Sequence, residues 1–179
     1  MWPFKSTSKV AGAVTVTREQ LAEVMWNLCQ EGAHDFSKQL QHEFQETEFT
    51  IEGDQKTILF SECIMLHLWL TSKVLAPEKE LLDSVHEHFF QTLQARVSNP
   101  KTLENIKAKL LDRYGRYYGA WSNEAKGSQF IFGTEVLQCL VNRGHPNQNL
   151  LSHCTEVVMY VLTFMAIVAK TRPKYEIAD

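Results

Sequence analysis

The sequence contains few cysteines, and none of them forms a CxxC pair. Its four cysteines each stand alone inside an apolar segment: Cys29, Cys63, Cys139 and Cys154. This spacing excludes a zinc knuckle and a thioredoxin-like redox motif. Unpaired thiols within a core are typical of proteins from reducing compartments. We therefore expect the protein in the cytoplasm or in another reducing compartment.

A clean membrane span is also missing. Two stretches, 58–76 and 150–169, approach the roughly 20 apolar residues that a bilayer requires. Ionisable side chains interrupt both of them: Glu62, His67 and Lys73 in the first, His153 and Glu156 in the second. A charge in mid-membrane costs roughly 2.5–3.5 kcal/mol on insertion scales. We therefore predict two buried core helices and no transmembrane span.

Basic residues are not in excess. Lysine and arginine together number 18 against 21 acidic residues, which gives a net charge of −3. Nucleic-acid-binding proteins usually carry a clustered basic excess, so we expect no nucleic-acid partner. A local basic strip consists of Lys107, Lys109, Arg113 and Arg116. We interpret this strip as a solvated helix face.

Motifs of common catalytic sites are absent. The sequence has no GxSxG, no P-loop, no GxGxxG after a strand and no HExxH. His153 and Glu156 could act as an acid–base pair, but no nucleophile motif accompanies them. The sequence thus favours a protein that is not an enzyme, and it indicates no cofactor.

Two carboxylate-x-x-His units resemble the ligands of di-iron helical bundles. They are Glu31 with His34 and Asp83 with His86, and Glu62 could supply a further carboxylate. At 100° per residue, however, His34 projects away from the apolar stripe of its own helix. The two further carboxylates and the order of a ferritin-like site are also missing. We therefore predict no metal site.

Apolar residues recur at helical spacing along nearly the whole chain. Thr17 and Gln20 form a capping-box pattern, and Pro77, Pro100 and Pro146 stand where new helices could begin. The pattern predicts six helices, at about 17–47, 56–75, 78–97, 101–125, 128–143 and 147–170. We expect one all-α bundle over 17–172, in which the second and sixth helices are central.

Short segments flank this predicted helical domain. Residues 1–16 are expected to form a flexible arm, and 173–179 a C-terminal tail. The arm carries two aromatic residues, Trp2 and Phe4. They leave peripheral membrane contact open as a hypothesis.

The segment LDRYGRYYGAWSNEAKGSQF, residues 111–130, is unusually rich in aromatic residues and glycine. On a helix its aromatic side chains share one arc: Tyr114, Tyr117, Tyr118 and Trp121. Gly115 and Gly119 form a second ridge with Ala108. Glycine inside a helix costs about 1 kcal/mol relative to alanine, so this pair suggests close approach by another helix or by a partner. We predict core packing first, with a groove for a protein partner beside it.

Five polar residues fall on or near apolar helix faces: His67, His86, His153, Glu156 and Tyr160. One interpretation is a buried hydrogen-bonded network. The alternative is an internal His/Glu site for a small ligand or a metal ion.

Four segments resemble the ubiquinol–cytochrome c chaperone family over about 60–143. They are LHLWL (66–70), LLDSVHEHFFQTLQAR (81–96), YYGAW (117–121) and LVNR (140–143). After YYGA an acidic, glycine-containing stretch tends to follow in that family, whereas SNEAKGSQF here carries one acid and one lysine. Members of the family are helical assembly factors without catalytic residues that engage newly made cytochrome b. The resemblance implies an apolar or aromatic groove near Tyr117, Tyr118 and Trp121.

Together these observations predict a non-catalytic binding or assembly module that engages a protein partner through the 101–125 helix. The alternative function is a small-ligand or metal-binding bundle. A homodimer formed through the edge of the 101–125 helix is compatible with either.

Overall fold

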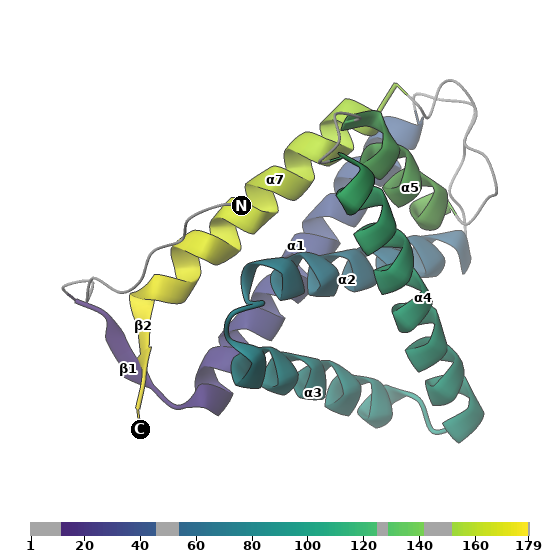
Figure 1. The fold of residues 1–179 in the computed structure, drawn as a ribbon. Coiled ribbons are helices and arrows are strands. Elements are labelled where there is room, and N and C mark those ends of the chain that lie inside the picture. Colours follow the sequence, from purple (N-terminus) through teal and green to yellow (C-terminus); the bar gives the residue numbers. More distant parts are fainter. Residues whose placement is uncertain (1–11, 46–53, 125–128, 142–151, 179) are drawn as a thin grey trace.

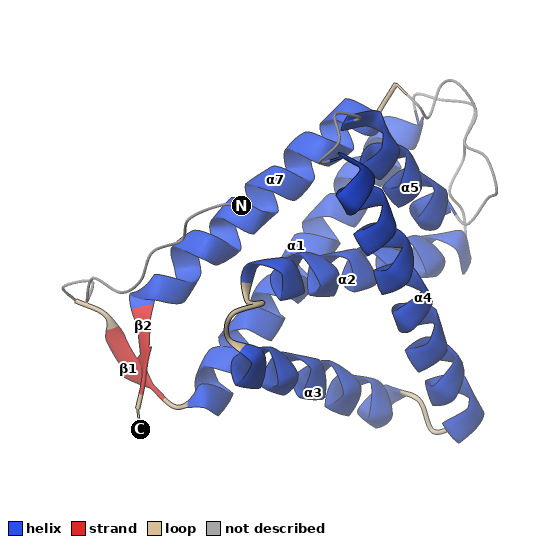
Figure 2. Ribbon diagram, viewed as in Figure 1, coloured by secondary structure: helices blue, strands red, loops and turns tan. Residues whose placement is uncertain are grey.

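The computed structural model describes residues 12–45, 54–124, 129–141 and 152–178, and these residues are almost entirely helical (Figures 1 and 2). The predicted all-α class is confirmed. The described helices are α1 (Arg18–Gln45), α2 (Asp54–Val74), α3 (Lys79–Arg96), α4 (Pro100–Glu124), α5 (Gln129–Val141) and α7 (Cys154–Thr171). The bounds of α1–α5 differ by one or two residues from those predicted. The predicted start of the last helix, at about 147, lies outside the described residues.

Local signals explain where α1 begins. The Thr17 amide donates to Gln20 Oε1 at 2.9 Å, and the Gln20 amide donates to Thr17 Oγ1 at 3.2 Å. The predicted capping box is therefore present, and it satisfies two amides that have no partner inside the helix.

Helix α2 is central, as its uniformly apolar sequence predicted. It crosses the middle of the bundle and contacts α1, α3, α4, α5 and α7 (Figure 1). Leu66, Leu68, Trp69 and Leu70 are all fully buried. A helix surrounded in this way buries side chains on every face, which explains why it shows little amphipathic pattern.

Helix α7 is not central, contrary to our expectation. One face enters the core through Val157, Val161, Phe164 and Val168. The opposite face is apolar but solvent-exposed, with large exposed side chains at Met159, Leu162 and Ile167. Apolar composition alone suggested burial on all sides, but among the described residues α7 packs against the bundle through one face.

Within the described residues, one helical segment, Cys154–Lys174, is long and apolar enough by length and composition to cross a bilayer. Within this segment, only 28% of the apolar 18-residue stretch is buried inside the protein.

The structure differs from the predicted N-terminal arm, 1–16, and from the predicted C-terminal tail, 173–179. Val14–Val16 (β1), assigned to the flexible arm, pairs in parallel with Tyr175–Ile177 (β2), assigned to the tail. Arg172 supports this pairing because it donates to the Tyr175 carbonyl and binds Glu78 at the start of α3. Residues 1–11, including Trp2 and Phe4, lie outside the described part of the chain.

Candidate functional site

The aromatic residues of α4 divide between core and surface. Tyr117 is fully buried, and its ring centroid lies 5.5 Å from that of Trp69. Phe132 of α5 stacks on Trp69 at 5.4 Å and also meets the Tyr117 ring edge to face, at 6.3 Å. Tyr117 is thus a core residue and not a wall of an accessible groove, which corrects its assignment as a partner-binding residue.

Tyr114 is half-buried and bonded to two neighbouring helices. The His86 Nδ1–H donates to the Leu82 carbonyl at 2.9 Å, and His86 Nε2 lies 2.8 Å from the Tyr114 hydroxyl. Ser72 Oγ lies 3.3 Å from the same hydroxyl. Burial raises the pKa of Tyr114, against the opposing effect of the Ser72 hydrogen bond. Tyr114 therefore ties α4 to α2 and α3.

The outer face of α4 is open to solvent. We define it as Ala108, Leu111, Gly115, Tyr118 and Gly119, all of which are exposed. A Cβ atom added to Gly115 or to Gly119 would meet nothing within 4 Å. Leu111 is 72% exposed and Tyr118 42% exposed beside them. The glycine pair therefore makes no packing contact among the described residues, and it leaves a gap in the row of side chains at these two positions, which we call the furrow.

Lys73 of α2 contacts the aromatic residues next to this face. The Lys73 ammonium lies over three aromatic rings, 5.0 Å from the Tyr118 centroid and 5.8 Å from those of Trp69 and Trp121. Burial lowers the pKa of Lys73. These cation–π contacts hold Tyr118 and the half-buried Trp121 against α2.

The five polar residues predicted to form one internal network occupy three separate contacts. The first is His67 with Tyr160, and the second is His86 with Tyr114. The third is His153 with Glu156 at the start of α7, where His153 Nδ1 is 2.6 Å from Glu156 Oε2. Within the part of the chain that the structure describes, these residues form separate paired contacts and do not meet at one internal site.

The His67 contact is the most deeply buried of the three. Its Nδ1–H donates to the Cys63 carbonyl at 2.7 Å, and Nε2 lies 2.9 Å from the Tyr160 hydroxyl. The single proton of that hydroxyl is donated to the Gly32 carbonyl at 2.8 Å. Burial lowers the pKa of His67 to about 4, although the bond to Cys63 favours the charged ring. His67 is consequently neutral in the folded protein near neutral pH.

This shift predicts a dependence of stability on pH. The unfolded chain binds a proton at His67 below about 6.5, whereas the folded chain does so only below about 4. The contribution of the neutral His67 ring to the free energy of unfolding is therefore fully present above about pH 6.5, and it is lost as the pH falls from there towards 4. The slope should reach about 1.4 kcal/mol per pH unit. Urea unfolding at several pH values measures it.

His67→Gln should remove this part of the slope, because glutamine does not titrate. His34→Gln is the matched control, since His34 is exposed, and it should leave the slope unchanged. An undiminished slope in His67→Gln would show that other groups cause the pH dependence.

A buried ion cluster joins α2 and α4, and we did not predict it from the sequence. Glu62 of α2 is fully buried and receives two hydrogen bonds from Arg113, at 2.8 and 2.9 Å. Lys109 lies 2.7 Å from the same carboxylate. Within the predicted solvated strip, Lys109 and Arg113 thus turn inward, and Arg116 pairs with Glu135 of α5. The sequence did contain a signal for this cluster. Glu62 lies inside an apolar helix, and Lys109 and Arg113 stand four residues apart on another helix.

The same cluster bears on the carboxylate-x-x-His motifs. Arg113 and Lys109 engage the Glu62 carboxylate, and His86 is bonded to Leu82 and Tyr114. His34 is exposed, as its helical position predicted. The three motif elements do not converge in the described structure.

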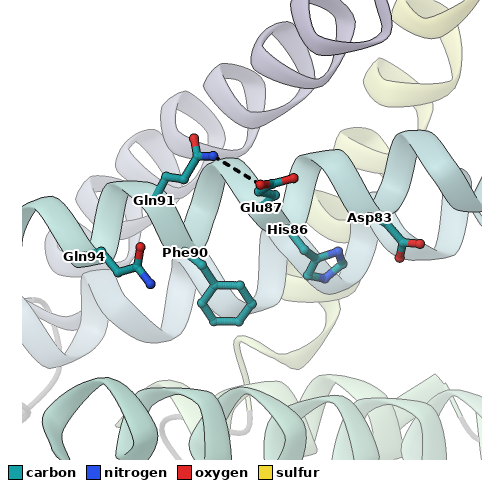
Figure 3. Close-up of a pocket in the computed structure, with 6 residues that line it drawn as sticks. All are labelled: Asp83, His86, Glu87, Phe90, Gln91 and Gln94. Carbon is teal, nitrogen blue, oxygen red and sulfur yellow. Dashed lines mark hydrogen bonds between the residues drawn. The ribbon is translucent and has the colours of Figure 1, made fainter. Parts of the chain in front are cut away.

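An open hollow of about 470 Å³ lies along α3, and it is lined by Asp83, His86, Glu87, Phe90, Gln91 and Gln94. Figure 3 shows His86 and Phe90 pointing from α3 towards the neighbouring α4 ribbon. Lys107 of α4 reaches the Phe90 ring, 5.2 Å from its centroid. We call this feature the α3 hollow. It offers carboxylate, amide and aromatic groups side by side.

The four cysteines are core residues. All four are buried and free. Burial raises the pKa of Cys29 to about 12 and that of Cys139 to about 11. Since the thiolate is the nucleophile, these side chains act as small core residues.

Comparison with known proteins adds no assignment. No family model, no curated protein and no solved structure matches this chain.

Proposed function

We propose that the protein is a non-catalytic binding or assembly module whose α4 outer face receives an apolar helix of a protein partner. The main observation in its support is that Gly115 and Gly119 have no neighbouring atoms where a side chain would be, and that they lie beside the exposed side chains of Leu111 and Tyr118. Glycines four residues apart on one helix face let another backbone approach closely. Because these glycines cost helix stability and fill no internal contact, an external contact explains them.

This surface differs from the groove predicted from sequence. Gly115, Tyr118 and Gly119 remain on it, whereas Tyr114 and Trp121 support it from beneath. Exposed apolar side chains next to a small-residue furrow suit a helix that presents large apolar residues. The resemblance of residues 60–143 to the ubiquinol–cytochrome c chaperones accords with such a partner, namely a newly made apolar protein under assembly.

A photocrosslinking experiment in cells tests the proposal. With p-benzoylphenylalanine in place of Leu111, illumination should yield a discrete adduct with one protein. The same group in place of Lys38, an exposed residue of α1, is the control and should give none. Gly119→Leu should abolish the Leu111 adduct by filling the furrow, whereas the smaller Gly119→Ala should retain most of it.

Two outcomes would decide against this surface. One is an adduct of equal yield in a Gly119→Leu protein that unfolds like wild type. The other is equal crosslinking at Lys38. An adduct at twice the 20.6 kDa chain mass would instead identify the partner as a second copy, the homodimer that the sequence left open.

The alternative, a small-ligand-binding bundle, is favoured by a different observation, the α3 hollow. Its mixture of two carboxylates, two carboxamides and the Phe90 ring would suit a polar molecule with an apolar part. The two hypotheses predict different companions of the purified protein. A small-ligand-binding bundle should retain an equimolar small molecule, whereas a protein-binding module should retain a second polypeptide.

A further inference from the structure

A cluster of three metal-ligating side chains joins the ends of two helices. Glu43 lies in the last turns of α1, His153 directly precedes α7, and Glu156 lies in the first turn of α7. One ligand atom from each side chain lies within 4.8 Å of the other two. The two helix ends come together at the top of Figure 1.

The separations are close to those around one metal ion. His153 Nδ1 is 2.6 Å from Glu156 Oε2 and 3.8 Å from Glu43 Oε2. In a tetrahedral zinc site, bonds of roughly 2.0–2.2 Å place neighbouring ligand atoms about 3.4 Å apart.

The cluster also has the support that metal ligands commonly receive. Gln39 donates to Glu43 Oε1 at 2.7 Å, which leaves Oε2 directed at His153. Such hydrogen bonds to ligating carboxylates fix their orientation. The side chains of His153 and Glu43 are only 17% and 22% exposed, so two of the three groups are held in place.

We propose that Glu43, His153 and Glu156 bind a divalent metal ion of the zinc class. One imidazole and two carboxylates are ligands that Zn²⁺ accepts, and three protein ligands leave a fourth position for water. The negative charges of Glu43 and Glu156, which both lie next to His153, also attract a cation to this position. The bound ion would link the C-terminal end of α1 to the N-terminal end of α7. This inference is independent of the α4 outer face.

Zinc titration of the full chain against a competing chelator dye tests the site. Wild type should bind one Zn²⁺ per chain with an affinity in the micromolar range or tighter. Glu43→Gln and His153→Gln should each weaken binding at least about tenfold. His34→Gln removes an exposed histidine elsewhere on α1 and should bind like wild type. Thermal unfolding with and without Zn²⁺ should show stabilisation in wild type and in His34→Gln only.

A simple ion pair predicts a different result. If His153 serves only to bridge the two carboxylates as a cation, wild type shows no saturable zinc binding, which overturns the proposal. Equal zinc affinity in wild type, Glu43→Gln and His153→Gln also overturns it, because the ion would then sit elsewhere. Glu156→Gln, at a 55% exposed position, provides a third ligand variant should either of the others fold poorly.

Discussion

Arg113→Met is expected to lower the free energy of unfolding by about 3–5 kcal/mol. The substitution leaves the Glu62 carboxylate fully buried without its two hydrogen bonds from the guanidinium, at 2.8 and 2.9 Å. Lys109 remains beside the carboxylate, but its side chain is 35% exposed. Since domains of this size are stable by roughly 5–15 kcal/mol, the variant should be near the edge of folding.

Arg116→Met provides the matched control, three residues along the same helix. Arg116 pairs with Glu135, but the side chains are 36% and 22% exposed, so water competes for both partners. Its loss should cost at most about 1 kcal/mol. Urea unfolding of the two variants measures the difference, and equal losses would contradict the special cost of the buried charge.

A double variant separates the charge from the packing. Glu62→Met with Arg113→Met removes both partners and should recover much of the stability lost in Arg113→Met, because no buried carboxylate remains uncompensated. A double variant as unstable as Arg113→Met would show that the packing of the arginine side chain, and not the orphaned charge, causes the loss.

Helix positions were predictable because they depend on local patterns. Apolar spacing, the Thr17 cap and the prolines define where α1–α5 begin and end, with little need for tertiary information. The pairing of Val14–Val16 with Tyr175–Ile177 was not predictable, because the two segments are distant in sequence. Three-residue strands carry too little pattern to identify their partner.

The candidate surface was only partly predictable for a similar reason. Helical geometry placed Tyr117 and Tyr118 on one arc and Gly115 and Gly119 on another. In the structure Tyr117 is buried, whereas Tyr118 is exposed beside the glycines. Which arc faces the core depends on where α2 and α5 pack, and the sequence of α4 does not contain that information. The pairing of Glu62 with Arg113 joins residues 51 positions apart, so the basic strip resembled a solvated face.

The glycines illustrate the same limit. Gly115 and Gly119 suggested close approach because they are adjacent on a helix, yet both are open. The glycines that accommodate close neighbours are Gly32, near Phe164 and His67, and Gly133, near Cys154. Each stands alone in its helix, so no local pattern distinguished it from any other glycine.

Gly133→Ala is expected to destabilise the protein by about 1–3 kcal/mol. A Cβ atom at Gly133 would lie 2.7 Å from the Cys154 carbonyl oxygen and 3.1 Å from the Cys154 Cβ. The nearest of these atoms belongs to the backbone, at the first residue of α7, and cannot rotate away. Helices α5 and α7 would have to move apart, which would loosen the contacts that both make with α2.

Gly119→Ala is the chemically identical substitution at an open helical site. No atom lies within 4 Å of the added methyl group, so the intrinsic preference of alanine for helix should stabilise the protein by up to about 1 kcal/mol. Urea unfolding should therefore shift in opposite directions for the two variants. A stabilised Gly133→Ala would mean that α5 and α7 are not in backbone contact there. A destabilised Gly119→Ala would mean that the α4 outer face is covered in the isolated protein, for example by a second copy of the chain.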